Sequence, residues 1–148
     1  MSADKKVKIS VFKKNSLGYS GVLLSIFFEL YFSVKILDSI PVGAMMGASC
    51  FINIVLLFLL FSVAVKVNLY RRFWAVIGLA VGGYAILRAF VLLPVVLRPT
   101  ENMSKLFLST LVEGILLVLS CLESYIVSSR RSTFLDSEEG QALTKEVR

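Results

Sequence analysis

Residues 71–99 read RRFWAVIGLAVGGYAILRAFVLLPVVLRP, and this stretch decides the fold of the chain. Between Phe73 and Leu97 the only charged residue is Arg88. A helix of this length, at ~1.5 Å per residue, exceeds the ~30 Å hydrocarbon core of a bilayer. The stretch therefore predicts a membrane-spanning helix with an arginine deep inside the membrane, where a charge requires a partner.

The composition of the whole chain indicates a membrane protein. Of its 148 residues 57% are hydrophobic and 18% are charged, whereas charged residues make up about 25% of a typical soluble domain. The net charge is +6, but the basic residues flank the apolar runs instead of following one soluble surface. We therefore expect the lipid bilayer, and no nucleic acid, as a partner.

Several residue types that catalytic and metal sites need are absent from the sequence. There is no histidine, and the two cysteines, Cys50 and Cys121, lie inside apolar runs. This argues against zinc, haem attachment, a Cys-His nucleophile and a disulfide framework. The sequence also has no phosphate-binding loop and no selectivity-filter motif. We expect no metal, no cofactor and no enzymatic activity.

Four apolar runs predict an all-α, polytopic membrane protein, a four-transmembrane-helix antiparallel bundle with short loops. The predicted spans are residues 17–37, 42–65, 73–97 and 106–127. Together they form one transmembrane domain, residues 17–127. A basic N-terminal arm at 1–16 precedes it, and a tail at 128–148 follows, which we predict to be largely disordered because an isolated short helix is marginal in water.

Polar side chains inside the spans follow single helix faces. The first span has Ser25, Glu29 and Ser33 at intervals of four residues, and the fourth has a similar stripe. The members of that second stripe are Thr110, Glu113, Ser120 and Ser124. Both stripes are expected to face the inside of the bundle.

Depth in the membrane brings three charged residues to a common level. With antiparallel helices at ~1.5 Å per residue, Glu29 lies ~18 Å from one end of its span and Arg88 ~22 Å from the same side. Glu113 lies ~11 Å from the opposite side, which is also near the middle. A buried Glu29–Arg88–Glu113 cluster is therefore expected, with Asn53 and Tyr84 as candidate hydrogen-bond donors. The cluster is either structural, a binding site for an ion or ligand, or a contact for helices of another protein.

Glycines spaced four residues apart mark surfaces that other helices can approach closely. Gly43 and Gly47 form one such pair near the start of the second span, and Gly78 and Gly82 form another in the third. The spacing does not say whether the partner helix belongs to this chain.

The distribution of Lys and Arg predicts the orientation. Twelve of the sixteen lie in the N-terminal arm, the loop at 66–72 and the tail, which share one side of a four-span bundle. Both termini should therefore be cytoplasmic. In the tail, Arg130 and Arg131 precede Ser132 and Thr133, which makes these two hydroxyls candidate phosphorylation sites, although the arginines also fit a simple orientation signal.

The functional expectation follows from what the sequence offers and lacks. Close-packing surfaces, short loops and no catalytic constellation favour a non-enzymatic accessory or regulatory subunit that packs against another membrane protein or a second copy. The alternative is a small transporter or channel-like oligomer that handles an ion or charged small molecule through the Glu/Arg cluster. Whether the cluster satisfies itself or lines a cavity distinguishes the two.

Overall fold

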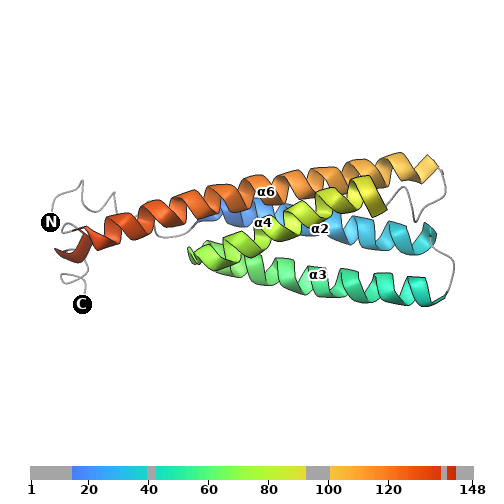
Figure 1. Ribbon diagram of the computed structural model, residues 1–148, viewed down its shortest axis with the longest axis horizontal. Coiled ribbons are helices and arrows are strands. Elements are labelled where there is room, and N and C mark those ends of the chain that lie inside the picture. Colours follow the sequence, from blue (N-terminus) through green and yellow to red (C-terminus); the bar gives the residue numbers. More distant parts are fainter. Residues whose placement is uncertain (1–14, 40–42, 93–100, 138–139, 143–148) are drawn as a thin grey trace.

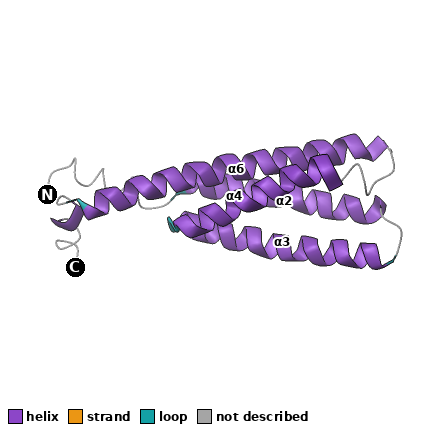
Figure 2. Ribbon diagram, viewed as in Figure 1, coloured by secondary structure: helices purple, strands orange, loops and turns teal. Residues whose placement is uncertain are grey.

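The computed structural model describes residues 15–39, 43–92, 101–137 and 140–142. Its long elements are α2 (Ser16–Ser39), α3 (Ala44–Asn68), α4 (Arg72–Leu87), the π-helical turn η1 (Arg88–Leu92) and α6 (Glu101–Asp136). Within these ranges no strand occurs (Figures 1 and 2). The all-α prediction is confirmed for the part of the chain that the structure describes.

In the described part of the chain, four helices are long and apolar enough to cross a membrane, as predicted. The spans are Ser16–Leu37, Met46–Asn68, Arg72–Val91 and Met103–Asp136. The first agrees closely with the prediction, and the second ends three residues later than the predicted boundary at residue 65. Pro94 and the predicted end of the third span lie outside the described residues. The four spans identify a multi-pass membrane protein.

The fourth helix is much longer than the predicted span at 106–127. Helix α6 has 36 residues, which corresponds to ~54 Å. Its last nine residues, 128–136, belong to the tail that was predicted to be largely disordered. The prediction treated this segment as isolated, but Ser128 Oγ donates to the Tyr70 carbonyl at 2.7 Å and Arg72 donates to the carbonyls of Ser128 and Ser129 at 3.4 and 3.2 Å. These contacts with the turn before α4 stabilise the continued helix.

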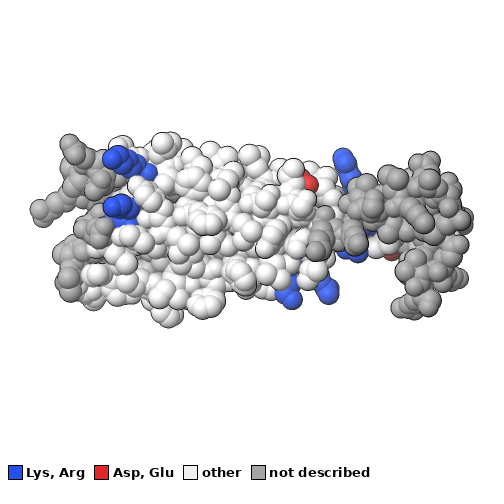
Figure 3. Space-filling model, turned by 180° about the vertical axis from the view of Figure 1, so that it is seen from behind, with Lys and Arg blue, Asp and Glu red and all other residues white. Residues whose placement is uncertain are grey.

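The inside and outside of the bundle differ as a lipid environment requires. Helix α6 packs along α4 and α2, and α3 packs on α2 and α4 (Figure 1). The main core contains Val22, Leu60, Val63, Leu117 and Cys121, all fully buried. Large apolar side chains cover the outside, and on the face in Figure 3 the visible blue side chains lie toward the ends with an uncharged middle. This arrangement is expected where the surrounding solvent is hydrocarbon.

The two predicted glycine pairs are used differently. A Cβ atom on Gly82 would come within 3.0 Å of Leu117 and 2.9 Å of Val118, and one on Gly78 would collide with the Cys121 sulfur. Gly78 and Gly82 therefore allow α4 to approach α6 closely. A Cβ on Gly43 or Gly47 would meet nothing within 4 Å among the described residues.

Candidate functional site

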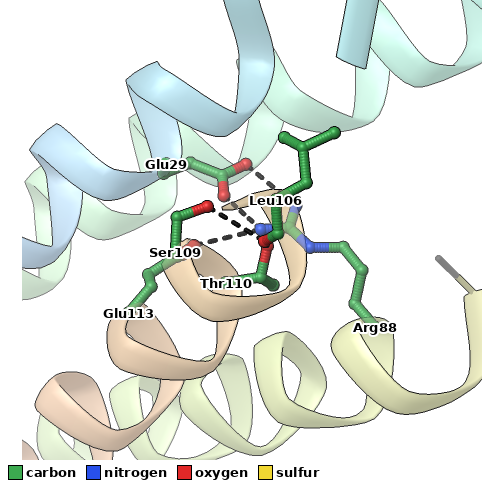
Figure 4. A network of polar contacts seen from close by, with 6 residues as sticks. All are labelled: Glu29, Arg88, Leu106, Ser109, Thr110 and Glu113. Carbon is green, nitrogen blue, oxygen red and sulfur yellow. Dashed lines mark hydrogen bonds and ion pairs between the residues drawn. The ribbon is translucent and has the colours of Figure 1, made fainter. Parts of the chain in front are cut away.

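The buried polar centre is an ion-pair triad that joins three helices. Arg88, at the junction of α4 and η1, donates through Nη1 to Glu29 Oε1 at 3.1 Å and through Nη2 to Glu29 Oε2. The same Nη2 also donates to Glu113 Oε2 at 3.1 Å. Figure 4 shows both carboxylates converging on the guanidinium from α2 and α6. The structure thus brings together the three charged residues that the depth comparison predicted.

The triad is closed off from its surroundings. The side chains of Arg88, Glu29 and Glu113 have relative exposures of 5%, 0% and 2%. Phe32 covers the guanidinium, whose central carbon lies 3.8 Å from the centre of the Phe32 ring. This cation–π contact adds to the two ion pairs. Phe32, Ile36, Ala89 and Leu106 form a second buried apolar cluster, which excludes lipid and water from this level of the bundle.

The hydroxyl groups next to the triad bond elsewhere. Ser109 Oγ and Thr110 Oγ1 both donate to the Leu106 carbonyl, at 2.9 and 2.8 Å, as Figure 4 also shows. On α2, Ser25 Oγ donates to the Val22 carbonyl at 2.7 Å. Serine and threonine commonly satisfy themselves in this way within helices. The two polar stripes therefore face inward as expected. At the level of the triad, however, the contacts between helices come from the ion pairs of Arg88 and not from these hydroxyl groups.

Two predicted members of the cluster take other roles. Tyr84 presents its ring, whose centre lies 5.9 Å from the guanidinium carbon of Arg88, and its hydroxyl makes no hydrogen bond to a described residue. Asn53 is 5% exposed, and its Nδ2 has no hydrogen-bond partner in the described part of the chain. Neither side chain donates to a triad carboxylate, and the described bonds to these carboxylates come from Arg88.

The charge of the triad is not balanced when every group is ionised. Two carboxylates and one guanidinium give a net charge of −1, and a proton on either carboxyl makes the group neutral. In addition, Arg88 Nε and the nearby stripe residue Ser33 have buried polar atoms without a described partner. An unpaired polar atom away from water is costly. The triad therefore has unused capacity for one proton and for hydrogen bonds.

Residues that sequence reasoning missed lie at both ends of the buried region. Phe32 is one helical turn after Glu29, and that i+3 spacing is the signal that could have placed it beside the same partner. Asn15 was assigned to the N-terminal arm, but it is 4% exposed. Its Oδ1 accepts from the Gly18 amide at 3.2 Å and its Nδ2 donates to Ser124 Oγ at 2.9 Å. Asn15 thus caps α2 and joins it to α6.

The candidate phosphorylation sites lie on the last turns of α6. Ser132 Oγ lies 3.4 Å from the Asp136 carboxylate, and Thr133 Oγ1 donates to the Ser129 carbonyl at 3.1 Å. Thr133 is exposed and Ser132 is partly buried. Within the described ranges no group of three or more metal-ligating side chains occurs.

No family model, no curated protein and no solved structure matches the chain. The functional interpretation therefore rests on the geometry of the triad and its surroundings.

Proposed function

We propose that this chain is a non-enzymatic accessory or regulatory subunit of a membrane assembly, which packs through its helices against another membrane protein or a second copy. The observation that carries the proposal is the closed triad. Glu29 and Glu113 both form ion pairs with Arg88, and their side-chain exposures are at most 2%. A group arranged in this way fixes helix register more readily than it receives a solute.

The outer surface of α3 supports a contact with a partner. Its first half exposes Gly47 with no neighbour within 4 Å among the described residues, and Phe51 and Phe58 are 69% and 72% exposed. A small residue one turn before a large apolar one lets a second helix approach while the aromatic rings extend the contact.

We infer further that the bundle is antiparallel with short loops and that both termini are cytoplasmic. The alternating direction of the chain from α2 to α6 in Figure 1 supports the first inference. The concentration of Lys and Arg in the arm, the loop before α4 and the tail supports the second. Protease applied to sealed right-side-out vesicles should leave a C-terminal tag intact. Cleavage of the tag from outside would contradict this orientation.

The subunit proposal is tested with paired glycine variants in native membranes. Gly47→Leu should release the partner during purification in mild detergent, because it fills the open surface of α3. Gly83→Leu is the matched control, since Gly83 on α4 also has no neighbour within 4 Å in the described structure. Both variants should keep the thermal stability of the isolated bundle. Equal retention of the partner by both variants would refute the use of this face.

Cys50 provides a second readout of the same face. It lies one turn after Gly47 and is partly exposed, whereas Cys121 is buried. A membrane-permeant bifunctional thiol reagent should link Cys50 of the wild-type protein to its partner and lose this product in Gly47→Leu. A chain that runs alone, without any cross-linked product, and that carries a solute across liposomes would overturn the subunit proposal.

The alternative proposal is a small transporter or channel-like oligomer. The specific observations in its favour are the surplus carboxyl group and the unpartnered Nε of Arg88. Together they would let the triad exchange one proton as the bundle opens. Proton-coupled flux in liposomes that Glu113→Gln abolishes, with the fold retained, would favour this alternative.

A further inference from the structure

A polar hollow lies where the start of α4 meets the end of α6. It has a volume of about 470 Å³, and its lining includes Arg71, Arg72, Arg131 and Ser132, with Leu69 and Leu135. The turn at 69–71 joins two membrane spans, Met46–Asn68 and Arg72–Val91. The hollow must therefore lie near the level of the lipid headgroups.

Two arginines of the hollow, Arg72 and Arg131, are held in place by contacts that leave their charge unpaired. Arg72 Nη2 donates to two α6 carbonyls, of Ser128 and Ser129, and Arg131 stacks over the Tyr70 ring with 4.7 Å between the guanidinium carbon and the ring centre. No acidic side chain of the described residues forms an ion pair with Arg71, Arg72 or Arg131. Two positioned guanidinium groups, with Arg71 lining the same space, are suited to an anion that accepts several hydrogen bonds.

The turn at residues 69–71, beside the hollow, has an uncommon backbone conformation that hydrogen bonds hold in place. Tyr70 has φ 58°, the left-handed conformation that residues other than glycine rarely adopt. Ser128 Oγ donates to its carbonyl, and the Arg71 amide donates to the Lys66 carbonyl at 3.1 Å. A conformation of this kind persists where its surroundings determine it. The turn therefore fixes the direction of Arg71 and Arg72 relative to α6.

The remaining groups near the hollow leave its charge positive. Burial raises the pKa of the Tyr70 phenol, although Arg131 lowers it and Glu123 raises it further. The phenol is thus neutral at physiological pH and does not offset the arginines. Two acids oppose them, Glu123 beside Tyr70 and Asp136 beside Ser132. The first turn of α4 adds the partial positive charge of a helix N-terminus.

We propose that this hollow binds the phosphomonoester headgroup of an anionic membrane lipid, with Arg71, Arg72 and Arg131 holding the phosphate. Leu69 is 58% exposed at its rim and directly follows the span Met46–Asn68, so it would contact the upper part of the lipid chains. This apolar contact favours a lipid over free phosphate. The site is separate from the triad and does not depend on the proposed subunit role.

The test measures lipid binding to the purified full-length chain in detergent by native mass spectrometry. The probes are short-chain phosphatidic acid, short-chain phosphatidylcholine and inorganic phosphate. Phosphatidic acid should bind at least about tenfold more tightly than either of the others. Equal binding of phosphatidylcholine would refute recognition of the phosphate. Equal binding of inorganic phosphate would show a free anion as the ligand and refute the lipid.

Neighbouring arginines supply the matched control. Arg131→Gln should weaken phosphatidic acid binding about tenfold or more, which corresponds to the loss of a hydrogen-bonded charge. Arg130→Gln removes the same charge from the adjacent, exposed position, and it should leave the affinity nearly unchanged. If both variants lose about fivefold, the attraction is only the general one of basic residues near an anionic surface, and the site does not exist.

A second variant keeps the test valid if Arg131→Gln disturbs the turn. Ser132→Asp places a negative charge on the rim of the hollow, and Ser132 bonds only Asp136 among the described residues. It should lower the affinity for phosphatidic acid about tenfold while gel filtration and helicity stay those of the wild type. Thr133→Asp, on the exposed side of the same turn, should have a smaller effect. Equal effects of the two aspartates would overturn the proposal.

Discussion

The glycine pair Gly43 and Gly47 at the start of α3 and the pair Gly78 and Gly82 on α4 have opposite surroundings in the structure. On α4, Gly82 lies against Leu117 and Val118 of α6. On α3, Gly47 faces open space in the described structure. The spacing of small residues thus indicates where a helix can be approached, and the rest of the fold determines whether the chain itself does so.

The difference follows from what α6 offers to its neighbours. Gly114 of α6 faces Gly82 so closely that a Cβ on Gly114 would lie 3.0 Å from the Gly82 carbonyl and 2.6 Å from Ile86. On the other side, Gly18 and Gly21 of α2 leave room for Ser124 and Ser120. Helices α2 and α4 therefore each pack closely against α6, and the triad joins the same three helices. Helix α3 adds apolar residues from its second half, such as Leu60 and Val63.

The largest effect on stability is expected from a substitution in the charged centre that joins α2, α4 and α6. Arg88→Leu should lower the free energy of unfolding by about 3–5 kcal/mol, because it leaves two buried carboxyl groups without their partner. Thermal or denaturant unfolding in detergent measures this loss. Part of the stability should return when Glu29→Leu is added, since the double variant removes an uncompensated charge.

A double-mutant cycle also ranks the two glutamates. Arg88 makes two contacts with Glu29 and one with Glu113, so the coupling energy should be larger for Glu29. Additive effects at both positions would show that Arg88 pairs with neither carboxylate in the membrane. Its counter-charge would then come from another chain or a bound anion.

A second substitution pair compares the close helix contact with the open one. Gly114→Ala should destabilise the bundle by about 1–3 kcal/mol, because the added methyl group meets the backbone of α4. Gly47→Ala should instead be neutral or stabilising by about 0.4–1 kcal/mol, since alanine is the better helix former and nothing described stands in its way. Unfolding of both variants under the same conditions measures the contrast. The reverse order would mean that α3, and not α4, provides the tight contact.

The extension of α6 gives a smaller effect. Ser128→Ala removes the hydrogen bond to the Tyr70 carbonyl and should cost about 1 kcal/mol. Ser129→Ala is the control, because only the backbone of Ser129 takes part in these contacts. Amide exchange in residues 129–136 should accelerate in the first variant and remain unchanged in the second. Unchanged exchange in both would show that the extension does not depend on the Tyr70 turn.

The smallest effect is expected at Asn53. Its Nδ2 is buried without a described partner, so Asn53→Leu should be neutral or slightly stabilising in the isolated bundle. Because the side chain is buried, the same variant should leave co-purification of a partner in native membranes unchanged. Destabilisation of the isolated bundle by more than about 1 kcal/mol would show that Asn53 is satisfied within the chain.

Sequence reasoning placed the charged centre because depth along a helix depends only on residue count. It brought Glu29, Arg88 and Glu113 to one level without knowing which faces meet. It could not assign Asn53 and Tyr84, because rotation about the helix axis depends on packing that residue types alone do not determine. It missed the helical extension past residue 127 for a related reason. The stabilising contacts come from Tyr70 and Arg72, more than 50 residues away.

The extension of α6 also places Arg131 and Asp136 at different distances from the membrane. Measured along the helix from Val127, Arg131 lies ~6 Å and Asp136 ~14 Å from the end of the predicted span. Electrostatic interactions in physiological salt are screened over ~8 Å. If the span ends at residue 127 as predicted, the arginine lies within range of the lipid phosphates, whereas Asp136 lies farther from them and is repelled less. A rigid helix can thus carry a basic and an acidic group in succession out of the bilayer, and the basic group senses the membrane's charge more strongly.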